Sequence, residues 1–484
     1  MTRTVVIGGG VGGLAIAIRL AAAGHEPLLV ERNEVVGGKL ATYTRDGYTF
    51  DIGPSLVTLP HLFDELFDLA GSPSADRLDL VRLDPQFRYH WRDGPTLTVA
   101  DDNDETAAAF EEFSAGAGAQ WHCFDARGRQ IWDVAERTFL AGAMTGPVSL
   151  ARRLRSPFDV TAIDPFRTLH RSAASYFDDD RLVQWAGRYA TYSGSSPFRA
   201  PATLACIPHI EARFGCWYPL GGLGTIRSAL ERLARDAGVE IRTSTEVTAV
   251  TADDHRVRGV VLDDGTEVAA DIVVANTDAE HLYTDLLPDA AASRRVRRAK
   301  RSTSGFAVCA AVRGLTPGLL HHNVWFSDDE RGEFEAIGRG ELADDPTIYG
   351  CVSAVTDRSQ APDGCENWFL LINTPPGAEI DRKRGTDLVF RRLASHGVAL
   401  RERIEFVHTM TPDEIAQRYR SPGGAIYGTS SDGMRAAFTR PANRGARAGL
   451  YLVGGSSHPG GGLPLVLTSA RIVAGMIADD EDER

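Results

Sequence analysis

Three glycines and one acidic residue near the start of the chain have a spacing that indicates chemistry. Gly8, Gly10 and Gly13 form a G-x-G-x-x-G pattern. At a strand-to-helix turn these positions permit a tight turn, close approach of the backbone to a pyrophosphate, and close packing of helix on strand. Glu31 lies farther along, where an acid hydrogen-bonds the adenosine ribose and repels a 2′-phosphate. The predicted dinucleotide site therefore contains Gly8, Gly10, Gly12, Gly13 and Glu31.

The elements that must position these residues can also be read from the sequence. Residues 4–7 are a β-branched run typical of a buried parallel strand, and residues 14–23 form an apolar helix that ends at Gly24. Residues 27–30 form a second strand, and Glu31 stands at its end. The alternative is a glycine-rich turn that binds no ligand. Such a turn would not require a strand, a helix, a second strand and an acidic residue at these spacings. We therefore predict a Rossmann-like α/β fold.

A second glycine pair and a D-x-G-P segment follow, at residues 37–38 and 51–54. The stretch of residues 4–55 resembles the superfamily of flavin-dependent amine oxidases and phytoene desaturases. In that superfamily the glycine pair and the next basic residue meet the FAD pyrophosphate, and the D-x-G-P segment borders the flavin. Lys39 stands where Arg is usual, which keeps the charge but loses the bidentate fork. The resemblance implies FAD as the cofactor, with Arg32, Gly38, Lys39, Gly53, Pro54 and Ser55 as contacts.

The C-terminal part carries a matching signature. Residues 450–477 read as a buried strand, a glycine-rich loop and a helix, and they resemble a desaturase motif through Gly454, His458, Pro459, Gly460, Gly462 and Pro464. The resemblance implies that Gly454, Gly462 and Leu463 contact FAD, because open N–H groups at a helix start can meet its oxygens. Many flavin amine oxidases carry an acid where this chain has Gly455, and its absence favours the carotenoid branch.

Segments in the middle of the chain narrow the resemblance to the bacterial-type phytoene desaturases. Residues 192–197 follow a Y-x-G-x-x-P pattern, and residues 217–222 follow W-x-P-x-G-G. In flavin enzymes of this class the chain then returns to the nucleotide domain, and the backbone near Val247 touches adenine. Taken alone, the aromatic residues of these two motif segments would more often belong to a hydrophobic core than to a cavity lining.

The composition excludes several classes of protein. A chain of 484 residues with 43% hydrophobic and 24% charged residues is an ordinary globular protein of two or three domains. A net charge of −13 argues against nucleic acid as a partner. The six cysteines form no C-x-x-C pair and the histidines form no H-E-x-x-H motif, so we predict no metal site and a cytoplasmic protein with reduced thiols. No apolar run is long enough to span a membrane.

The predicted architecture is α/β, with a discontinuous FAD-binding domain and an α+β substrate domain. We expect the FAD-binding domain to comprise residues 1–75, 215–300 and 445–484. The substrate domain would comprise residues 76–214 and 301–444, with a sheet and a mostly helical part at about 104–190. Within that part, residues 146–170 mix apolar residues with arginines. They suit either a peripheral membrane surface or a lid packed on the protein itself.

Four functions are compatible with these features. The resemblance favours an FAD-dependent desaturase that removes hydride from a carotenoid or similar long polyene. The alternatives are a flavin-dependent polyene isomerase, an amine oxidase-like enzyme on a soluble substrate, and a non-catalytic binder. A lipophilic substrate implies attachment to a membrane surface. Hydride transfer to flavin needs no triad, so the catalytic residue stays unknown, and His458 is expected to have a structural or cofactor-contact role. The oligomeric state is not predicted.

Overall fold

The protein is described here by a computed structural model, which covers residues 2–72, 78–144, 146–156, 158–433 and 436–483. The described residues contain a five-stranded parallel sheet with the order β19-β13-β1-β2-β9. Its strands are β1 (Arg3–Ile7), β2 (Glu26–Val30), β9 (Glu240–Arg242), β13 (Ile272–Ala275) and β19 (Leu450–Leu452). They come from three separate parts of the chain. The sheet is therefore complete only when both ends of the sequence come together.

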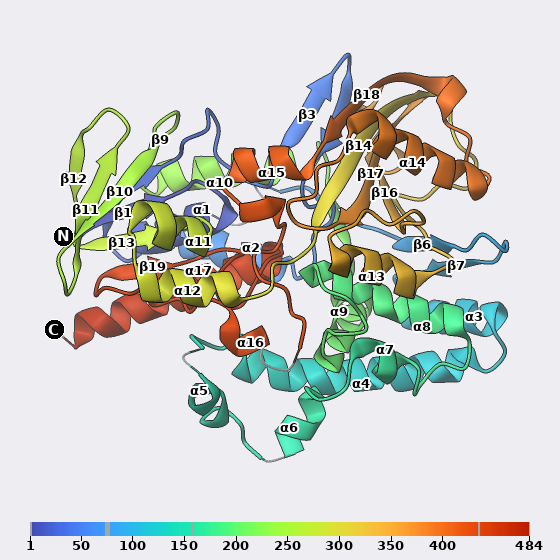
Figure 1. The fold of residues 1–484 in the computed structure, drawn as a ribbon, viewed down its shortest axis with the longest axis horizontal. Coiled ribbons are helices and arrows are strands. Elements are labelled where there is room, and N and C mark those ends of the chain that lie inside the picture. Colours follow the sequence, from blue (N-terminus) through green and yellow to red (C-terminus); the bar gives the residue numbers. More distant parts are fainter. Residues whose placement is uncertain (1, 73–77, 145, 157, 434–435, 484) are drawn as a thin grey trace.

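Alternate side chains of this sheet pack on opposite faces, as the period of two in a strand requires. Val6 and Leu29 face the helices α1 (Val11–Ala22), α10 (Gly224–Asp236) and α17 (Leu463–Asp482). Val5 and Leu28 face a small antiparallel sheet of β10 (Val247–Ala252), β11 (Val257–Leu262) and β12 (Glu267–Ala269). This half of the molecule lies at the left of Figure 1.

A seven-stranded sheet forms the other half, with the order β18-β14-β17-β16-β15-β6-β7. Its strands are β6 (Phe87–His90), β7 (Thr96–Val99), β14 (Ser304–Arg313), β15 (His322–Trp325), β16 (Ile348–Val352), β17 (Cys365–Thr374) and β18 (Ile404–Met410). Phe306 and Trp368 pack on one face, with α14 (Arg382–Ser395). Ala307 and Phe369 point to the opposite face, which borders the cavity described below.

The remaining elements connect and cover these sheets (Figure 1). The other strands are β3 (Thr42–Arg45), β4 (Tyr48–Asp51), β5 (Leu80–Arg82) and β8 (Trp217–Pro219). The other α-helices are α2 (His61–Leu69), α3 (Asn103–Phe113), α4 (Ala117–Thr138), α5 (Pro147–Ala151), α6 (Phe158–Ile163), α7 (Leu169–Ala173), α8 (Asp180–Gly187), α9 (Cys206–Phe214), α11 (Ala279–His281), α12 (Ala290–Arg298), α13 (Glu330–Arg339), α15 (Pro412–Tyr419) and α16 (Ala436–Thr439). Short 3₁₀ or π turns are η2 (Arg188–Ser193), η3 (Ala202–Ala205), η4 (Leu282–Leu286), η5 (Ser353–Val355), η6 (Arg358–Gln360), η7 (Arg401–Arg403) and η8 (Pro422–Gly424).

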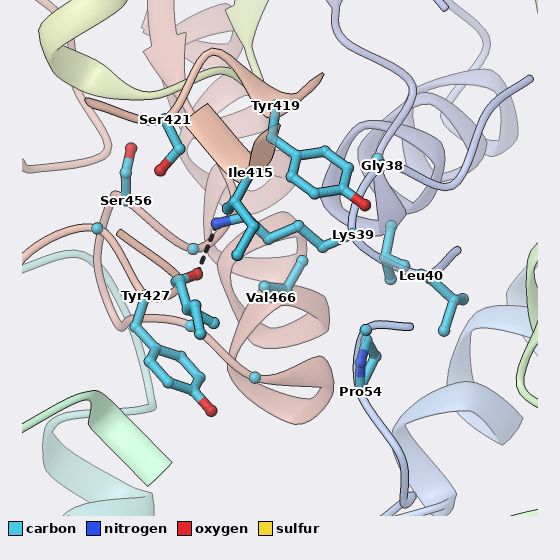
Figure 2. Close-up of a pocket in the computed structure, with 18 of the residues that line it drawn as sticks. Gly38, Lys39, Leu40, Pro54, Ile415, Tyr419, Ser421, Tyr427, Ser456 and Val466 are labelled. Atoms are coloured by element: carbon cyan, nitrogen blue, oxygen red, sulfur yellow. Dashed lines mark hydrogen bonds between the residues drawn. The ribbon is translucent and has the colours of Figure 1, made fainter. Parts of the chain in front are cut away.

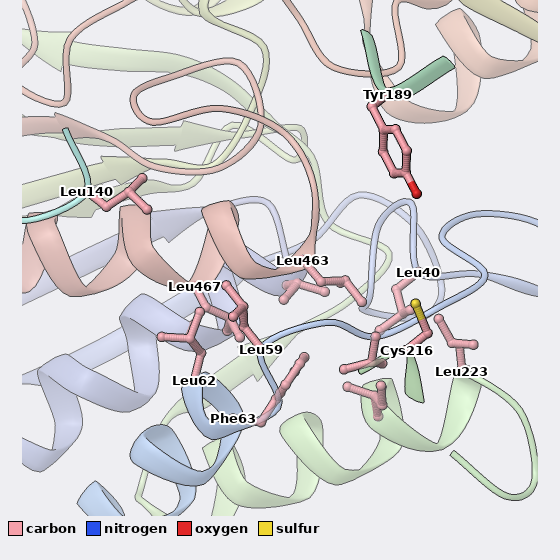
Figure 3. Packing of buried hydrophobic residues seen from close by; sticks show 14 of the residues in the cluster. Leu40, Leu59, Leu62, Phe63, Leu140, Tyr189, Cys216, Leu223, Leu463 and Leu467 are labelled. Carbon is pink, nitrogen blue, oxygen red and sulfur yellow. The ribbon is translucent and has the colours of Figure 1, made fainter. Parts of the chain in front are cut away.

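The largest apolar core joins the N-terminal and C-terminal parts of the chain. Leu467 of α17 lies beside Leu59, Leu62 and Phe63 of the segment that enters α2 (Figure 3). All four side chains are nearly inaccessible to solvent. Burial of such side chains contributes about 1.5–3 kcal/mol each. This core therefore holds α17 against the first βαβ unit.

The structure confirms the predicted α/β class and most of the predicted elements. Residues 104–190 are largely helical, and β6 and β7 pair as an antiparallel hairpin. The first helix begins at Val11, before the predicted start, because Gly12 and Gly13 belong to its first turn. No helix in the described part of the chain is both long and apolar enough to cross a bilayer.

Candidate active site

One elongated cavity of about 500 Å³ lies between the two large sheets. It extends from the glycine loop after β1 to the inner face of the seven-stranded sheet. Most of the predicted cofactor contacts line it, namely Gly8, Gly10, Gly12, Glu31, Arg32, Gly38, Lys39, Gly53, Pro54, Ser55, Val247, Gly462 and Leu463. Residues predicted from three separate segments are thus brought to one place. Gly13 and Gly454 are not among the lining residues, and both pack closely against neighbouring groups.

Two helices begin at the wall of this cavity without a side-chain cap. The N-cap residues are Gly10 for α1 and Gly462 for α17, and neither helix has an acidic residue in its first turn. By contrast, the Asp102 carboxylate caps α3 by accepting from two backbone N–H groups. The first N–H groups of α1 and α17 are therefore available to an anionic or oxygen-rich ligand. A dinucleotide fits this pair of open helix ends.

The glycines allow backbone segments to approach at distances that a side chain would block. A Cβ on Gly13 would lie 2.0 Å from the carbonyl oxygen of Gly8, and one on Gly454 would lie 2.4 Å from Oδ1 of Asn276. The Asn276 amide also donates a 3.0 Å hydrogen bond to the carbonyl oxygen of Gly8. Asn276 lines the cavity but was missed by sequence reasoning, although its position directly after a buried strand was a usable signal.

The Glu31 carboxylate holds the glycine loop in place. It is 5% exposed and accepts hydrogen bonds from the N–H of Gly9 at 2.7 Å and the N–H of Asn33 at 2.8 Å. The side-chain amide of Asn33 donates a third hydrogen bond at 2.6 Å. Because a carboxylate offers about four acceptor positions, it retains capacity for one more donor. A ribose hydroxyl would meet that need.

Lys39 points across the cavity toward the segment that follows η8. Its ammonium group donates to the carbonyl oxygen of Ile426 at 2.5 Å, the dashed line in Figure 2. It also donates to the carbonyl oxygen of Ala425 at 3.3 Å. Burial lowers the pKa of Lys39 to about 8, and the nearby Asp278 carboxylate opposes that shift. In this structure Lys39 thus joins the N-terminal segment to residues 425–426, which the resemblance did not indicate.

Beyond the cofactor end, the cavity wall becomes largely apolar. Ala307, Val324, Phe369 and Leu371 line it from the inner face of the seven-stranded sheet, and Phe326 lies at its far part. Such a surface favours a hydrocarbon over a charged substrate.

Polar groups interrupt this wall near Ser55. The hydroxyls of Ser55 and Tyr349 are 2.5 Å apart, and the Tyr349 hydroxyl is 2.8 Å from Nδ1 of His322. Burial lowers the pKa of His322 well below its usual value, so the imidazole is neutral near pH 7. These hydrogen bonds connect Ser55, a predicted cofactor contact, to His322 of the seven-stranded sheet.

His321, His322 and Cys351 come together behind this wall, with one ligand atom from each within 4.8 Å of the others. Sequence spacing had shown no metal motif. Burial raises the pKa of the Cys351 thiol well above its usual value, and a thiol binds metal as a thiolate. The three groups form a buried cluster where the start of β15 meets β16.

His458 packs against the residue that follows α4. Its Nε2 is 2.9 Å from the carbonyl oxygen of Phe139, and its ring packs edge-on against the Phe139 ring. The side chain is 1% exposed and is not among the residues that line the cavity. Burial lowers its pKa to about 4. His458 therefore ties the end of α4 to the loop before α17.

The fold combines a Rossmann-like sheet with a separate seven-stranded sheet across one cavity, and the family match places it among the flavin-dependent oxidoreductases. Residues 11–478 match the family model described as "Flavin containing amine oxidoreductase". The chain belongs to this family, and its cofactor is FAD, as predicted.

Curated relatives match the chain over nearly its full length. The chain is 35% identical to 4,4'-diapolycopene oxygenase of Methylomonas sp, over 99% of this chain and 98% of the relative. It is 37% identical to hydroxyneurosporene desaturase of Cereibacter sphaeroides, with coverage of 99% and 98%. Identity with the zeta-carotene-forming phytoene desaturase of Myxococcus xanthus is 35%, with coverage of 97% and 93%.

Solved structures support the same fold at low sequence identity. A putrescine oxidase triple mutant aligns with a TM-score of 0.68 and 14% identity, covering 100% of this chain and 99% of the other. A fatty acid isomerase from P. acnes that produces CLA aligns with a TM-score of 0.64 and 14% identity, with coverage of 99% and 98%.

Proposed function

We propose that this protein introduces double bonds into a carotenoid or similar long polyene. The observation that carries the proposal is the continuous cavity, which joins two open helix N-termini to an apolar sheet face. The full-length similarity to carotenoid desaturases supports it. FAD, when bound, supplies the hydride acceptor.

The residues proposed to hold FAD occupy three segments. The glycine loop and the start of α1 would meet the pyrophosphate, Glu31 the adenosine ribose, and the backbone at Val247 the adenine. Gly53, Pro54, Ser55 and the start of α17 would border the flavin. These segments all line the same cavity, which supports this assignment.

The protein's own contribution to the reaction is to position the polyene and to exclude competing chemistry. An allylic C–H bond of a polyene has no acidic proton and no carbonyl group for a nucleophile to attack. Loss of hydride leaves a positive charge that conjugation spreads, so the adjacent proton can pass to water or to an ordinary side chain. Ala307, Val324 and Phe369 would hold the chain against this wall and keep the reacting carbons in place. No dedicated base is proposed.

A second candidate function is oxygenation of a similar polyene. The 35% identity with 4,4'-diapolycopene oxygenase favours it. The relatives' names include both hydrocarbon and hydroxylated carotenoids, so similarity alone leaves the kind of polyene open.

Anaerobic mixing of the purified flavoprotein with a polyene in liposomes tests the function. Desaturation should bleach the flavin absorbance and yield a product that has lost two hydrogen atoms. A product that requires oxygen and gains an oxygen atom would support the second candidate. A rearranged product of unchanged mass, formed without net flavin reduction, would instead indicate an isomerase.

We also propose that the protein is cytoplasmic and attaches to a membrane surface through residues 146–170. Val148, Phe158 and Phe166 are exposed by 65%, 80% and 71%. Arg152 and Arg155 are exposed beside them, and α5 and α6 project from the lower edge of the molecule (Figure 1). Apolar side chains flanked by cations suit an anionic bilayer surface. Such attachment would let a water-insoluble substrate enter from lipid.

A further inference from the structure

Arg188 places a buried cation in a cavity whose sheet face suits a hydrocarbon, and Glu330 and Glu333 line the same cavity. It is the first residue of η2, it is 8% exposed, and it lines the cavity. Its guanidinium carbon lies 4.7 Å from the centre of the Phe87 ring and 5.4 Å from that of Tyr89. Burying a cation is costly, and a chain that binds only hydrocarbon gains nothing from that cost on this wall.

The guanidinium has hydrogen-bonding capacity to spare. It donates to the hydroxyl of Tyr89 at 3.2 Å and more weakly to that of Tyr192 at 3.5 Å. Arginine carries five N–H donors. Among the described residues, no carboxylate oxygen lies close enough to form an ion pair with Arg188 under a 4.0 Å limit. Donors that reach the cavity are therefore available to a ligand.

The charge of Arg188 is nevertheless balanced nearby. The hydroxyls of Tyr192 and Tyr189 donate to the two oxygens of Glu211, at 2.6 Å and 2.8 Å. Burial raises the pKa of Glu211, while the Arg188 charge and the two phenol hydrogen bonds favour its ionised form. Tyr192 bridges Glu211 to Arg188. A carboxylate on the substrate would add an uncompensated negative charge to this cluster. A neutral oxygen would accept the free N–H groups without that cost.

We propose that this cavity recognises a polyene that carries a neutral oxygen, in a hydroxyl or carbonyl group, and that the Arg188 guanidinium binds this oxygen. The inference rests on the proposed polyene function and specifies the kind of polyene. Binding to Arg188 would also fix the position of the oxygenated end of the substrate in the cavity. The Arg188 charge would destabilise the positive charge that hydride loss leaves on the polyene. The favoured arrangement therefore has Arg188 near the oxygen and away from the reacting carbons.

The experiment compares two polyenes that differ only in a terminal hydroxyl group, using the FAD-loaded protein in liposomes. Wild type should show a higher kcat/KM for the hydroxylated polyene. In Arg188→Met, which keeps length but removes charge and donors, that preference should fall by about tenfold to a hundredfold, the range for a hydrogen bond to a charged group. The preference is the ratio of kcat/KM for the two polyenes within each variant, so a general loss of activity cancels. Arg232→Met is the matched control, because Arg232 is exposed on α10.

The outcomes separate this inference from the proposed function. If neither polyene reduces the flavin, the proposed function is wrong. If both reduce it and wild type shows no preference, or prefers the hydrocarbon, only the role of Arg188 is wrong. A preference that persists in fully flavinated Arg188→Met also overturns it.

A second pair of measurements covers the case in which Arg188→Met does not fold. Tyr192→Phe removes the hydroxyl that bridges Arg188 and Glu211, and it should lower the same preference while flavin content stays normal. A polyene that ends in a carboxylate should be a poorer substrate than the hydroxylated one. If the carboxylated polyene is preferred, the neutral-oxygen assignment is wrong.

Discussion

A Cβ atom on Gly13 would lie 2.0 Å from the carbonyl oxygen of Gly8. The first turn of α1 therefore packs directly on the backbone that leaves β1, and the cofactor loop depends on this contact. We predict that Gly13→Ala lowers the free energy of unfolding by about 1–3 kcal/mol, the usual cost of overpacking. The purified variant should also contain less FAD. Denaturant unfolding and the flavin-to-protein absorbance ratio measure both effects.

Gly475 provides the matched control in another helix. No heavy atom lies within 4 Å of a Cβ built there, and the residue is in the middle of α17. Gly475→Ala should be neutral or stabilise the protein by up to about 1 kcal/mol. Equal stability losses in the two variants would contradict the packing role of Gly13.

Glu31 should contribute to FAD binding through the loop that it holds. Glu31→Gln replaces one acceptor by an amide N–H, which would face the donors of Gly9 or Asn33. We expect FAD affinity to fall by about 1–3 kcal/mol, the range for hydrogen bonds to a charged group. Titration of the apoprotein with FAD, followed by flavin fluorescence, gives the dissociation constant. The exposed Glu34→Gln should bind FAD like wild type.

Asp51 should make stability depend on pH in acid. Its carboxyl group is 5% exposed and accepts from the hydroxyl of Tyr218 and the N–H of Leu223, and burial raises its pKa from 3.8 to about 6. The folded protein then retains a proton that the unfolded chain loses. The contribution of this group is therefore fully present below about pH 4 and is lost as the pH rises through about 6.

Asp51→Asn removes this titration. Relative to wild type, the variant should gain stability between about pH 4 and pH 7, by roughly 3 kcal/mol at most. Denaturant unfolding of both apoproteins across this range gives the difference directly. A constant difference, or one that shrinks as the pH rises, would show that Asp51 titrates normally.

Membrane attachment should depend on the exposed aromatic residues of the 146–170 segment. Replacing both Phe158 and Phe166 by Ser should greatly reduce co-flotation with anionic liposomes, because each inserted ring contributes about 1.5–3 kcal/mol. Leu315→Ser is the control, since Leu315 is 53% exposed in another region. Wild-type protein that fails to float, yet desaturates a lipid-dissolved polyene, would contradict the proposal.

His458 should be dispensable for the chemical step. Its ring is buried against Phe139 and is not among the cavity-lining residues, so His458→Ala should retain turnover when FAD occupancy is matched to wild type. Its stability should fall, because the contact between α4 and the C-terminal loop is lost. Complete loss of flavin reduction in a fully flavinated variant would instead identify His458 as catalytic.

The sequence by itself determined the fold class and much of the candidate cofactor site. Glycine spacing, the acid at the end of the second strand and the C-terminal glycine loop are local patterns, and each specifies a backbone geometry over a few residues. Gly13 and Gly454 were predicted as cofactor contacts, and the structure adds that they approach Gly8 and Asn276 too closely for a side chain. Local spacing shows that a glycine is needed without showing which neighbour requires it.

Only the tertiary structure decided which side chains share the cavity with these motifs. Asn276 reaches Gly8 because β13 lies next to β1, and Lys39 meets residues 425–426 from the other end of the chain. Arg188, Tyr192 and Glu211 form one cluster although they come from η2 and α9. These contacts depend on how distant elements pack, and the energy of burying a charge or an apolar chain depends on those neighbours. Residue type and spacing do not contain that information.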